Sequence, residues 1–230
     1  MLNIDNLTIL YSDGTRAVDG AGFTLEAGCR AALIGANGAG KTTLLLGLVG
    51  ILPPAGGKIY VDGVRLEKKS LRDIRLKIGL VFQNPDDQLF MPNIFEDVAF
   101  GPRNSGCDEK ETAERVNAAL ARLNIAHLAE RSPLKLSGGE KRLAAIAAVI
   151  ATDPAYLLFD EPTAYLDPKA RRGLAEVIRS LPQGILVATH DLAFAETVCP
   201  RVLLLQDGRL ASDGDVSLLR DAETLEAAGL

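Results

Sequence analysis

The stretch Gly35-Ala36-Asn37-Gly38-Ala39-Gly40-Lys41-Thr42-Thr43 decides the fold of this chain. An apolar run at residues 31–34 comes directly before it and predicts a buried strand. A second apolar run at residues 44–49 follows it and predicts the first turns of a helix. Strand, glycine-rich turn, lysine–threonine pair and helix together form the G-x-x-x-x-G-K-[ST] pattern of a phosphate-binding loop.

The residue types in this pattern suit phosphate chemistry. Glycines let successive backbone N–H groups turn inward, and these amides form a concave anion site with the N-terminus of the following helix. Lys41 adds a mobile positive charge for the outer phosphates, and the Thr42 hydroxyl can ligate Mg²⁺. A plain glycine-rich turn is the alternative, and the Lys-Thr pair in register argues against it. We therefore expect residues 35–43 to bind a nucleoside triphosphate.

Composition limits the class of protein. The chain has 230 residues, of which 47% are apolar, so it can bury a sizeable core in one large domain or one domain with an insert. Its net charge is −5 with both signs interspersed, so we expect no nucleic-acid partner. Cys29, Cys107 and Cys199 are far apart and odd in number, which is typical of reduced thiols in a cytosolic protein.

The sequence contains no candidate membrane segment. Residues 1–5 have neither the basic nor the apolar region of a secretory signal. The richest apolar stretch, residues 143–158, is interrupted by Thr152-Asp153-Pro154. We expect the chain itself to be soluble and to act on a membrane process only by docking.

Predicted strands lie on both sides of a helical block. Residues 2–11 and 17–27 predict two strands joined by a hairpin at Asp13-Gly14. Further strands are predicted at residues 58–61, 80–82, 155–159, 184–189 and 202–205. Capping residues predict helix starts at Asp108, Ser137 and Asp167.

This alternation predicts an α/β fold. We expect one domain covering residues 1–230, with an N-terminal antiparallel β subdomain and an α-helical subdomain at about residues 84–152.

Two carboxylates follow the apolar run at residues 156–159. Asp160 and Glu161 stand at the C-terminal end of a predicted buried strand, where α/β sheets present their ligands. We expect Asp160 to hold Mg²⁺, usually through water, and Glu161 to orient or deprotonate the attacking water in phosphate hydrolysis. The alternative is that Asp160 and Glu161 are an ordinary surface pair before Pro162. The presence of a phosphate-binding loop in the same chain argues against this alternative.

Two isolated histidines complete the titratable residues of interest. His190 follows the predicted strand at residues 184–189, and we expect it to contact the γ-phosphate at the same sheet edge. A structural or merely exposed histidine is the alternative. His127 lies among Ile125, Ala126 and Leu128 and is given no role. Scattered histidines and cysteines predict no transition-metal site.

The stretch Leu136-Ser137-Gly138-Gly139-Glu140, with Gln83 and His190 flanking the carboxylate strand, resembles the nucleotide-binding domain of ABC transporters. The resemblance covers essentially the whole chain and implies a P-loop NTPase fold. It also implies a head-to-tail homodimer with two ATP molecules at the interface. Each ATP would lie on one subunit's loop and under Ser137, Gly138, Gly139 and Glu140 of the other. A second glycine-rich helix N-terminus, which is a second anion site, agrees with this arrangement.

The resemblance also assigns roles to single residues. It implies that Tyr11 stacks on adenine, that Gln83 contacts Mg²⁺ and acts in catalysis with Glu161 and His190, and that Asp167 communicates across the dimer. Gln83 would also relay to a membrane partner. Tyr11 as a simple hairpin residue and Asp167 as a simple helix N-cap are the alternatives.

Two positions depart from the family pattern. Glu140 stands where the family usually has Gln. Because Ser137-x-x-Glu140 is also a capping box, the carboxylate is expected to fold back onto its own helix. The loop Ala164-Tyr165-Leu166-Asp167 is bulkier than the common small-residue form.

The run Gln83-Asn84-Pro85-Asp86-Asp87-Gln88-Leu89-Phe90 is similar to the ATPases of energy-coupling-factor importers, and residues 96–102 fit the same group. Its apolar end, residues 89–91, predicts a docking patch near Gln83–Met91 for integral membrane transporter subunits. The alternative is that these apolar side chains pack locally under their own loop.

The resemblance thus implies an ATP hydrolase at the cytoplasmic face of the cell membrane, using ATP and Mg²⁺. The end of the chain at residue 230 resembles that of single-ATPase systems, which form homodimers. This resemblance implies uptake of a micronutrient, and cobalt or nickel ions are the expected transported substrate. An exporter or vitamin-importer ATPase, a soluble non-transport ABC ATPase and a phosphotransferase remain alternatives.

Overall fold

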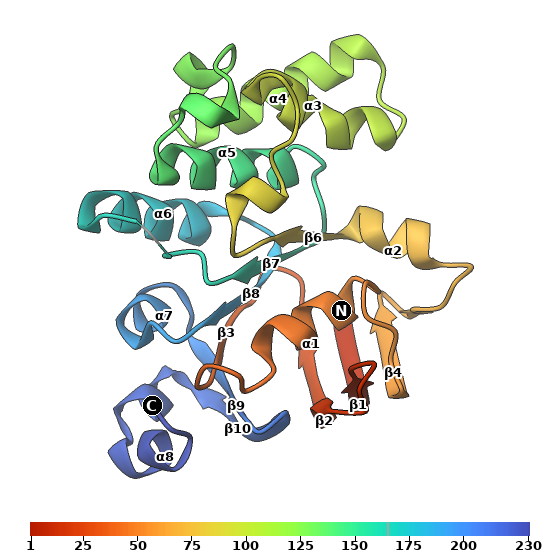
Figure 1. The fold of residues 1–230 in the computed structure, drawn as a ribbon, viewed down its shortest axis with the longest axis vertical. Coiled ribbons are helices and arrows are strands. Elements are labelled where there is room, and N and C mark those ends of the chain that lie inside the picture. Colours follow the sequence, from red (N-terminus) through yellow and green to blue (C-terminus); the bar gives the residue numbers. More distant parts are fainter. Residues whose placement is uncertain (165) are drawn as a thin grey trace. The chain divides into compact units, whose positions relative to one another are not determined.

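The computed structural model describes residues 1–164 and 166–230 (Figure 1). The chain divides into two compact units. The first comprises Met1–Leu80, Ala155–Glu161 and Pro182–Leu230, and the second comprises Val81–Pro154 and Pro162–Leu181. Tyr165, in the bulky loop noted above, lies outside the described residues.

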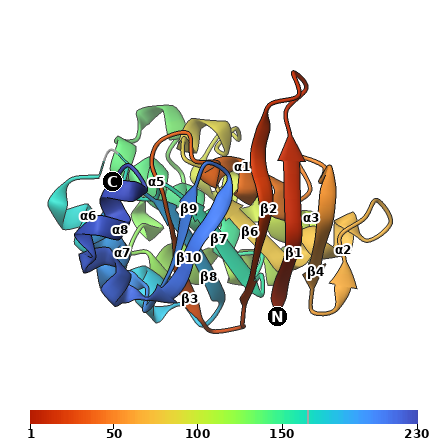
Figure 2. The same ribbon diagram turned by 90° about the horizontal axis from the view of Figure 1, so that it is seen from below.

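The first unit contains an antiparallel sheet in the order β2-β1-β4-β5 among the described residues. Its strands are β1 (Leu2–Leu10), β2 (Arg16–Leu25), β4 (Gly56–Val61) and β5 (Val64–Arg65). β1 pairs with both β2 and β4, and Figure 2 shows these three strands side by side. The predicted N-terminal antiparallel subdomain and its hairpin are confirmed.

A second sheet has the order β10-β9-β3-β8-β7-β6. Its strands are β3 (Arg30–Ile34), β6 (Ile78–Val81), β7 (Tyr156–Asp160), β8 (Gly184–Thr189), β9 (Arg201–Gln206) and β10 (Arg209–Asp215). β3 pairs in parallel with β8 and β9, and β7 pairs in parallel with β8. Because β7 and β8 are buried along their whole length, they are the continuous apolar runs that the sequence showed.

Two strands of this sheet differ from the prediction. β6 begins at Ile78 and ends at Val81, so it lies earlier than the expected residues 80–82. β10 was not predicted, because only alternate residues of this polar strand are half-buried. It pairs antiparallel with β9 through a tight turn in which Asp207 and Gly208 both have positive φ, of 47° and 77°.

The core of the first unit lies where the two sheets meet α1 (Lys41–Leu48). It combines Leu7, Ile9 and Val18 of the antiparallel sheet, Leu44, Leu45 and Leu48 of α1, and Leu33, Leu158, Leu186 and Leu203 of the second sheet. Three short helices complete the unit, α2 (Leu71–Lys77), α7 (Leu192–Val198) and α8 (Ala222–Ala227), with a 3₁₀ turn at Val216–Arg220. The helix that follows the glycine-rich loop is therefore anchored on its apolar side.

The second unit is helical. Its helices are α3 (Ile94–Asn104), α4 (Glu109–Arg122), α5 (Gly138–Ile150) and α6 (Pro168–Ser180), with 3₁₀ turns at Pro85–Asp87, Ala126–Leu128 and Pro133–Lys135. α3, α4 and α5 pack against one another, as Figure 1 shows. Asp108, Ser137 and Asp167 cap α4, α5 and α6, which confirms the three predicted helix starts.

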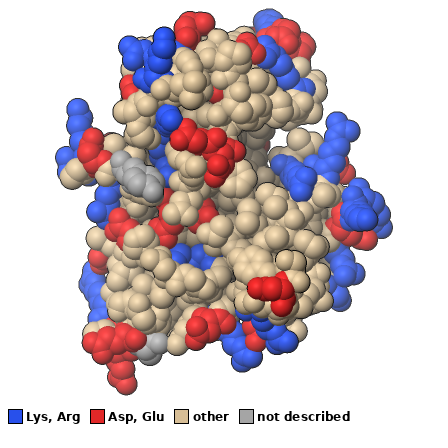
Figure 3. Space-filling view, viewed as in Figure 1, with Lys and Arg blue, Asp and Glu red and all other residues tan. Residues whose placement is uncertain are grey.

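A helical subdomain is thus present, while its proposed extent of residues 84–152 within a single domain stays a prediction. Within the described part of the chain, no helix has both the length and the apolar character needed to cross a membrane. On the face shown in Figure 3, acidic and basic side chains are interspersed.

A buried tyrosine anchors the strand that carries the two carboxylates. Tyr156 begins β7, is fully buried, and donates its hydroxyl to Asp62 Oδ1 at 2.9 Å. Asp62 follows β4 and also accepts from Lys77 Nζ at 3.0 Å. Burial, together with the Asp62 carboxylate, raises the pKa of Tyr156 to about 12.

Tyr156→Phe should lower the free energy of unfolding by about 1 kcal/mol near neutral pH, because it removes one buried hydrogen bond while Lys77 still pairs with Asp62. Because the folded state favours the protonated phenol, Tyr156 makes its full contribution to the free energy of unfolding below about pH 10. It is lost as the pH rises through about 12. The chain has four tyrosines and no tryptophan, so an absorbance titration of tyrosinate can follow this ionisation.

The tyrosine ionisation at about pH 12 should be present in the wild type and absent from Tyr156→Phe. Tyr60→Phe, which leaves the Tyr156–Asp62 bond intact, should retain it. Identical titrations of the wild type and Tyr156→Phe would contradict the assignment.

Candidate active site

The glycines of the loop between β3 and α1 have different roles. A Cβ atom at Gly35 would lie 2.3 Å from the Leu205 carbonyl oxygen, and one at Gly40 would lie 2.3 Å from the Ala17 carbonyl oxygen. Gly40 also has φ +102° as the N-cap of α1. A Cβ atom at Gly38 would meet nothing within 4 Å, so this glycine is favoured only by its φ of +85°.

Backbone hydrogen bonds hold the loop in place. Ala39 N donates to the Ala36 carbonyl at 3.1 Å, and Leu44 N donates to the Gly40 carbonyl at 2.8 Å. From the β9–β10 turn, Gly208 N donates to the Ala39 carbonyl at 3.0 Å. The loop is thus a preformed cradle whose shape depends on backbone contacts with two other segments.

Lys41 turns back over this loop. Its side chain is 7% exposed, and its Nζ donates to the carbonyl oxygens of Gly35 at 2.7 Å and Ala36 at 3.1 Å. Glu161 Oε1 lies 3.7 Å from the same nitrogen. Burial lowers the pKa of Lys41, and the carboxylates of Glu161 and Asp160 oppose that shift. The ammonium is therefore placed at the loop and shared between the loop carbonyls and a carboxylate.

Glu161 is held by three neighbouring groups. Its Oε2 accepts from the Thr189 hydroxyl at 2.9 Å and from His190 N at 3.4 Å, and its Oε1 lies 2.9 Å from His190 Nδ1. The residue has φ +42°, an uncommon value for a non-glycine residue. Its own N–H donates to the Ala188 carbonyl at 2.8 Å, which fixes the backbone in that conformation.

Thr189 was missed by the sequence analysis. Its hydroxyl donates to Glu161 and accepts from Asp191 N at 3.0 Å, so its orientation is set from both sides. The available signal was its place as the last residue of the strand that leads into His190. Thr189 is buried, whereas the side chain of His190 is 60% exposed and in contact with Glu161 on one ring nitrogen.

Sheet register explains why these residues meet. Ile34, at the end of β3, pairs with Thr189 on β8, and Asp160, at the end of β7, pairs with Ala188 on β8. The loop, the two carboxylates and His190 therefore follow the C-terminal ends of adjacent strands. Buried Asp160 and exposed Thr42 offer carboxylate and hydroxyl oxygens, which are the donors that Mg²⁺ prefers.

Tyr11 also belongs to this unit. It lies just beyond β1, is 46% exposed, and its hydroxyl is 2.5 Å from Thr43 Oγ1 on α1. The structure therefore places the ring beside the helix that follows the loop. Stacking on adenine stays a prediction.

The remaining predicted residues lie in the second unit. Gln83 is exposed after β6, and its carbonyl accepts from the buried guanidinium of Arg142. Asp167 caps α6, with its Oδ1 accepting from Lys169 N and Ala170 N at 2.8 Å each. The N–H groups of Ala170 and Lys169 hold the pKa of Asp167 below its usual value. Its role across a dimer stays a prediction, and exposed His127 lies in the 3₁₀ turn Ala126–Leu128.

The glycine-rich start of α5 contains the expected capping box. Glu140 Oε2 accepts from Ser137 N at 2.8 Å and from Ser137 Oγ at 2.7 Å. Glu140 N donates to Ser137 Oγ at 3.3 Å. The N–H and the hydroxyl of Ser137 hold the pKa of Glu140 below its usual value. The prediction that this carboxylate folds back onto its own helix is confirmed.

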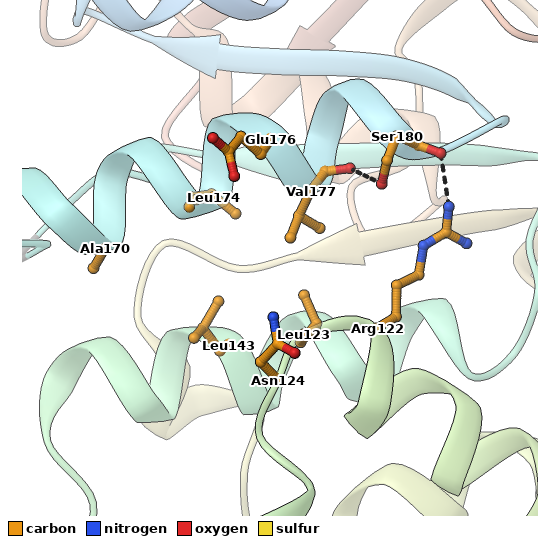
Figure 4. Close-up of a pocket in the computed structure, with 10 residues that line it drawn as sticks. Arg122, Leu123, Asn124, Leu143, Ala170, Leu174, Glu176, Val177 and Ser180 are labelled. Carbon is orange, nitrogen blue, oxygen red and sulfur yellow. Dashed lines mark hydrogen bonds between the residues drawn. The ribbon is translucent and has the colours of Figure 1, made fainter.

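The second unit also has a hollow of about 350 Å³ between α6 and the α4–α5 region (Figure 4). Leu143, Leu174 and Val177 point into it, and Arg122 donates to the Ser180 carbonyl at its edge at 2.7 Å. None of the predicted site residues lines this hollow.

A model of the ABC transporter family matches residues 18–164, a span that includes the glycine-rich loop, the capping box and both carboxylates. The chain belongs to the ABC transporter family. It is an ABC-type ATPase and ATP-binding subunit, with the P-loop NTPase fold that the sequence predicted.

Relatives include the energy-coupling factor transporter ATP-binding protein EcfA of Carboxydothermus hydrogenoformans. It is 42% identical over 232 residues, which is 100% of this chain and 86% of that protein. EcfA of Methanothermobacter thermautotrophicus is also 42% identical, over 236 residues covering 100% of this chain and 76% of that protein. The resemblance to energy-coupling-factor ATPases is confirmed.

Solved structures share the fold closely. CbiO1 of Clostridium perfringens, described as part of the ABC transporter complex CbiONQ, has a TM-score of 0.86 and 35% identity over 97% of this chain and 92% of its own. The dimeric cassette MJ0796 in a post-hydrolysis state with ADP and Pi has a TM-score of 0.85 and 26% identity. That match covers 94% of this chain and 99% of the cassette.

Glu140→Gln should leave the ATPase rate of this ABC protein within a few-fold of wild type. The carboxylate is turned toward Ser137, and Gln can maintain the same capping box. The measurement is phosphate release at saturating Mg-ATP, with Glu140→Ala as the control that removes the reciprocal bond. A loss beyond about tenfold in Glu140→Gln, or about 1.4 kcal/mol, would contradict a purely capping carboxylate.

Proposed function

We propose that this ABC ATPase is the ATP-binding subunit of an energy-coupling-factor importer, and that it hydrolyses Mg-ATP as a head-to-tail homodimer. The observation that carries the proposal is its similarity along the whole chain to two EcfA proteins. CbiO1, whose fold it shares, is described as part of a transporter complex. The working site is the cytoplasmic face of the cell membrane.

The first unit supplies the hydrolytic groups in this proposal. The amides of residues 35–43 and the Lys41 ammonium bind the phosphates. Glu161 orients the attacking water and accepts its proton at a carboxylate oxygen, while Thr189 and His190 hold that carboxylate in place. His190 contacts the γ-phosphate. Thr42 and Asp160 would hold Mg²⁺, which would supply positive charge to neutralise the phosphate oxygens. The part of Gln83, which belongs to the second unit, in holding this ion stays a prediction.

The second unit supplies the partner's half of the site. Exposed Ser137 and Gly138 begin a helix of 13 residues, so their amides form a second anion site that one triphosphate on one chain does not need. We infer that Ser137, Gly138 and Gly139 cover the ATP bound to the other subunit, while the Glu140 carboxylate, predicted from the family to share this role, instead holds Ser137 in place. Asp167 communicates between the subunits. The dimeric cassette with ADP and Pi supports this arrangement.

Glu161→Gln should trap an ATP-bound dimer. The amide retains hydrogen bonds to Thr189 and His190 but cannot take a proton from water, so ATP stays bound at the interface. Light scattering with Mg-ATP should report twice the mass of the protomer, and phosphate release should fall by about a hundredfold or more. A variant that remains monomeric with ATP and hydrolyses it at the wild-type rate would refute the role of Glu161.

An exposed aromatic pair supports docking to membrane subunits near Gln83–Met91. Phe90 is 63% exposed and Phe100 is 42% exposed, and their rings meet edge to face at 5.0 Å. Asp97, which is buried, accepts from Phe90 N and Met91 N at 2.9 Å each. A buried carboxylate therefore holds the backbone beneath the exposed ring. Such a patch suits contact with apolar protein surface.

Affinity purification from detergent-solubilised native membranes should recover a small membrane scaffold and a substrate-binding membrane protein. Cobalt or nickel on the latter would identify the proposed cargo. Phe90→Ser should lose both proteins while retaining ATPase activity, because Phe90 lies outside the proposed hydrolytic groups. A large permease would indicate another ABC transporter, and ribosomes or DNA-repair proteins would indicate a non-transport ATPase. Phosphate transferred to a small molecule rather than to water would indicate a phosphotransferase.

A further inference from the structure

An asparagine followed by a glycine lies in the middle of the loop between β3 and α1. Asn37 and Gly38 are both exposed, and they form the only Asn-Gly pair in the sequence. In such a pair the backbone nitrogen of the glycine can attack the side-chain amide carbon of the asparagine, because the attack closes a five-membered ring. The glycine has no side chain to hinder that ring. The pair therefore has the chemistry for loss of the side-chain amide, which is deamidation.

The local structure leaves the attacking nitrogen accessible. Ala39 N donates to the Ala36 carbonyl at 3.1 Å, so Asn37 and Gly38 are the two central residues of a turn. Within the described part of the chain, neither the Gly38 N–H nor the Asn37 side chain makes a hydrogen bond. A Cβ atom at Gly38 would meet nothing within 4 Å, so the space beside this residue is open.

Asn104 is in the opposite situation. It ends α3, is also exposed, and also precedes a small residue, Ser105. Ser105 N, however, donates to the Gly101 carbonyl at 3.0 Å and to the Pro102 carbonyl at 3.1 Å. Attack on Asn104 therefore requires these hydrogen bonds to break first. Asn104 is thus an internal control for Asn37.

We propose that Asn37 is a site of spontaneous deamidation and that nucleotide bound at the loop protects it. Gly38 N attacks Asn37 Cγ, the N–Cγ bond forms, the Cγ–Nδ2 bond breaks, and ammonia leaves with the amide proton. Water then opens the resulting succinimide ring. Opening at Cγ gives aspartate, and opening at the backbone carbonyl carbon gives isoaspartate, whose main chain runs through Cβ and Cγ. The reaction needs only water and no change of oxidation state.

Both products alter the proposed anion site. Aspartate places a negative charge among the amides that are proposed to bind phosphate. Isoaspartate adds one atom to the main chain between Gly35 and Gly40. The loop cannot absorb that atom by moving its ends, because each of these two glycines lies against a carbonyl group of a neighbouring strand. The turn between them must therefore distort.

The protection rests on the proposed function, in which the loop amides bind phosphates. A phosphate oxygen that accepts from the Gly38 N–H occupies the attacking nitrogen and holds the turn closed. Only the unliganded fraction of the protein then reacts, so the rate of deamidation falls as occupancy rises. Deamidation of the nucleotide-free chain does not depend on that function.

Peptide mapping of the aged full-length chain tests the site. Trypsin should release residues 31–41, in which Asn37 is the only asparagine, glutamine or aspartate, and residues 104–110, in which Asn104 is the only side-chain amide. Without nucleotide, the first peptide should gain one mass unit about tenfold faster than the second. A sample digested without ageing corrects for deamidation during digestion. Deamidation of Asn37 no faster than that of Asn104 would overturn the proposal.

Ageing with Mg²⁺ and a non-hydrolysable ATP analogue tests the protection. At about ten times its Kd, the analogue should slow deamidation of Asn37 by about tenfold and leave that of Asn104 unchanged. A bound analogue that leaves the rate at Asn37 unchanged would overturn the protection together with the proposed placement of phosphate at Gly38. Fast deamidation of the free chain would still establish the site in that case.

Activity measurements connect the site with ATP binding. Asn37→Asp should raise the Kd of the analogue by about tenfold, because its carboxylate repels phosphate. During ageing, the ATPase rate of the wild type should fall in step with the modified fraction of residues 31–41. Asn37→Ser has no side-chain amide there, so it should keep its own starting rate over the same period. Equal fractional losses in the wild type and Asn37→Ser would overturn this consequence of deamidation.

Discussion

The structure of the first unit depends on the close approach of three backbone segments at the glycine-rich loop. Gly35 meets the Leu205 carbonyl and Gly40 meets the Ala17 carbonyl at distances that exclude any side chain. Ala17 belongs to the antiparallel sheet, and Leu205 belongs to the sheet that carries the carboxylates. The same glycines that allow a phosphate cradle therefore also allow the two sheets to join at that cradle.

Local chemistry explains what could be predicted from the sequence. Each feature that was predicted is specified by a short stretch of sequence. These features are the loop pattern, the carboxylates after an apolar strand and the cap at Ser137, and the structure contains all of them. β10 escaped prediction because its polar alternation is weak. Thr189 escaped it because its partner Glu161 lies 28 residues away in the chain, so no local pattern reports it.

Several residues of the second unit combine structural and proposed catalytic duties. Glu140 completes a capping box and Asp167 caps α6, so both carboxylates would be needed for helix stability even without ATP. Arg142 is buried and holds the carbonyl of Gln83. Residues in or near the family motif thus also cap the helices of this unit and hold its segments by hydrogen bonds.

The closeness of Lys41 and Glu161 has a consequence for how these two charged groups act. Lys41 Nζ lies 3.7 Å from Glu161 Oε1 and also donates to two loop carbonyls. On the proposed chemistry, an arriving triphosphate competes for the ammonium and leaves the carboxylate with only Thr189 and His190. Lys41 and Glu161 therefore share one electrostatic neighbourhood, so the charge proposed to bind the outer phosphates and the carboxylate proposed to receive the proton of water cannot be altered independently.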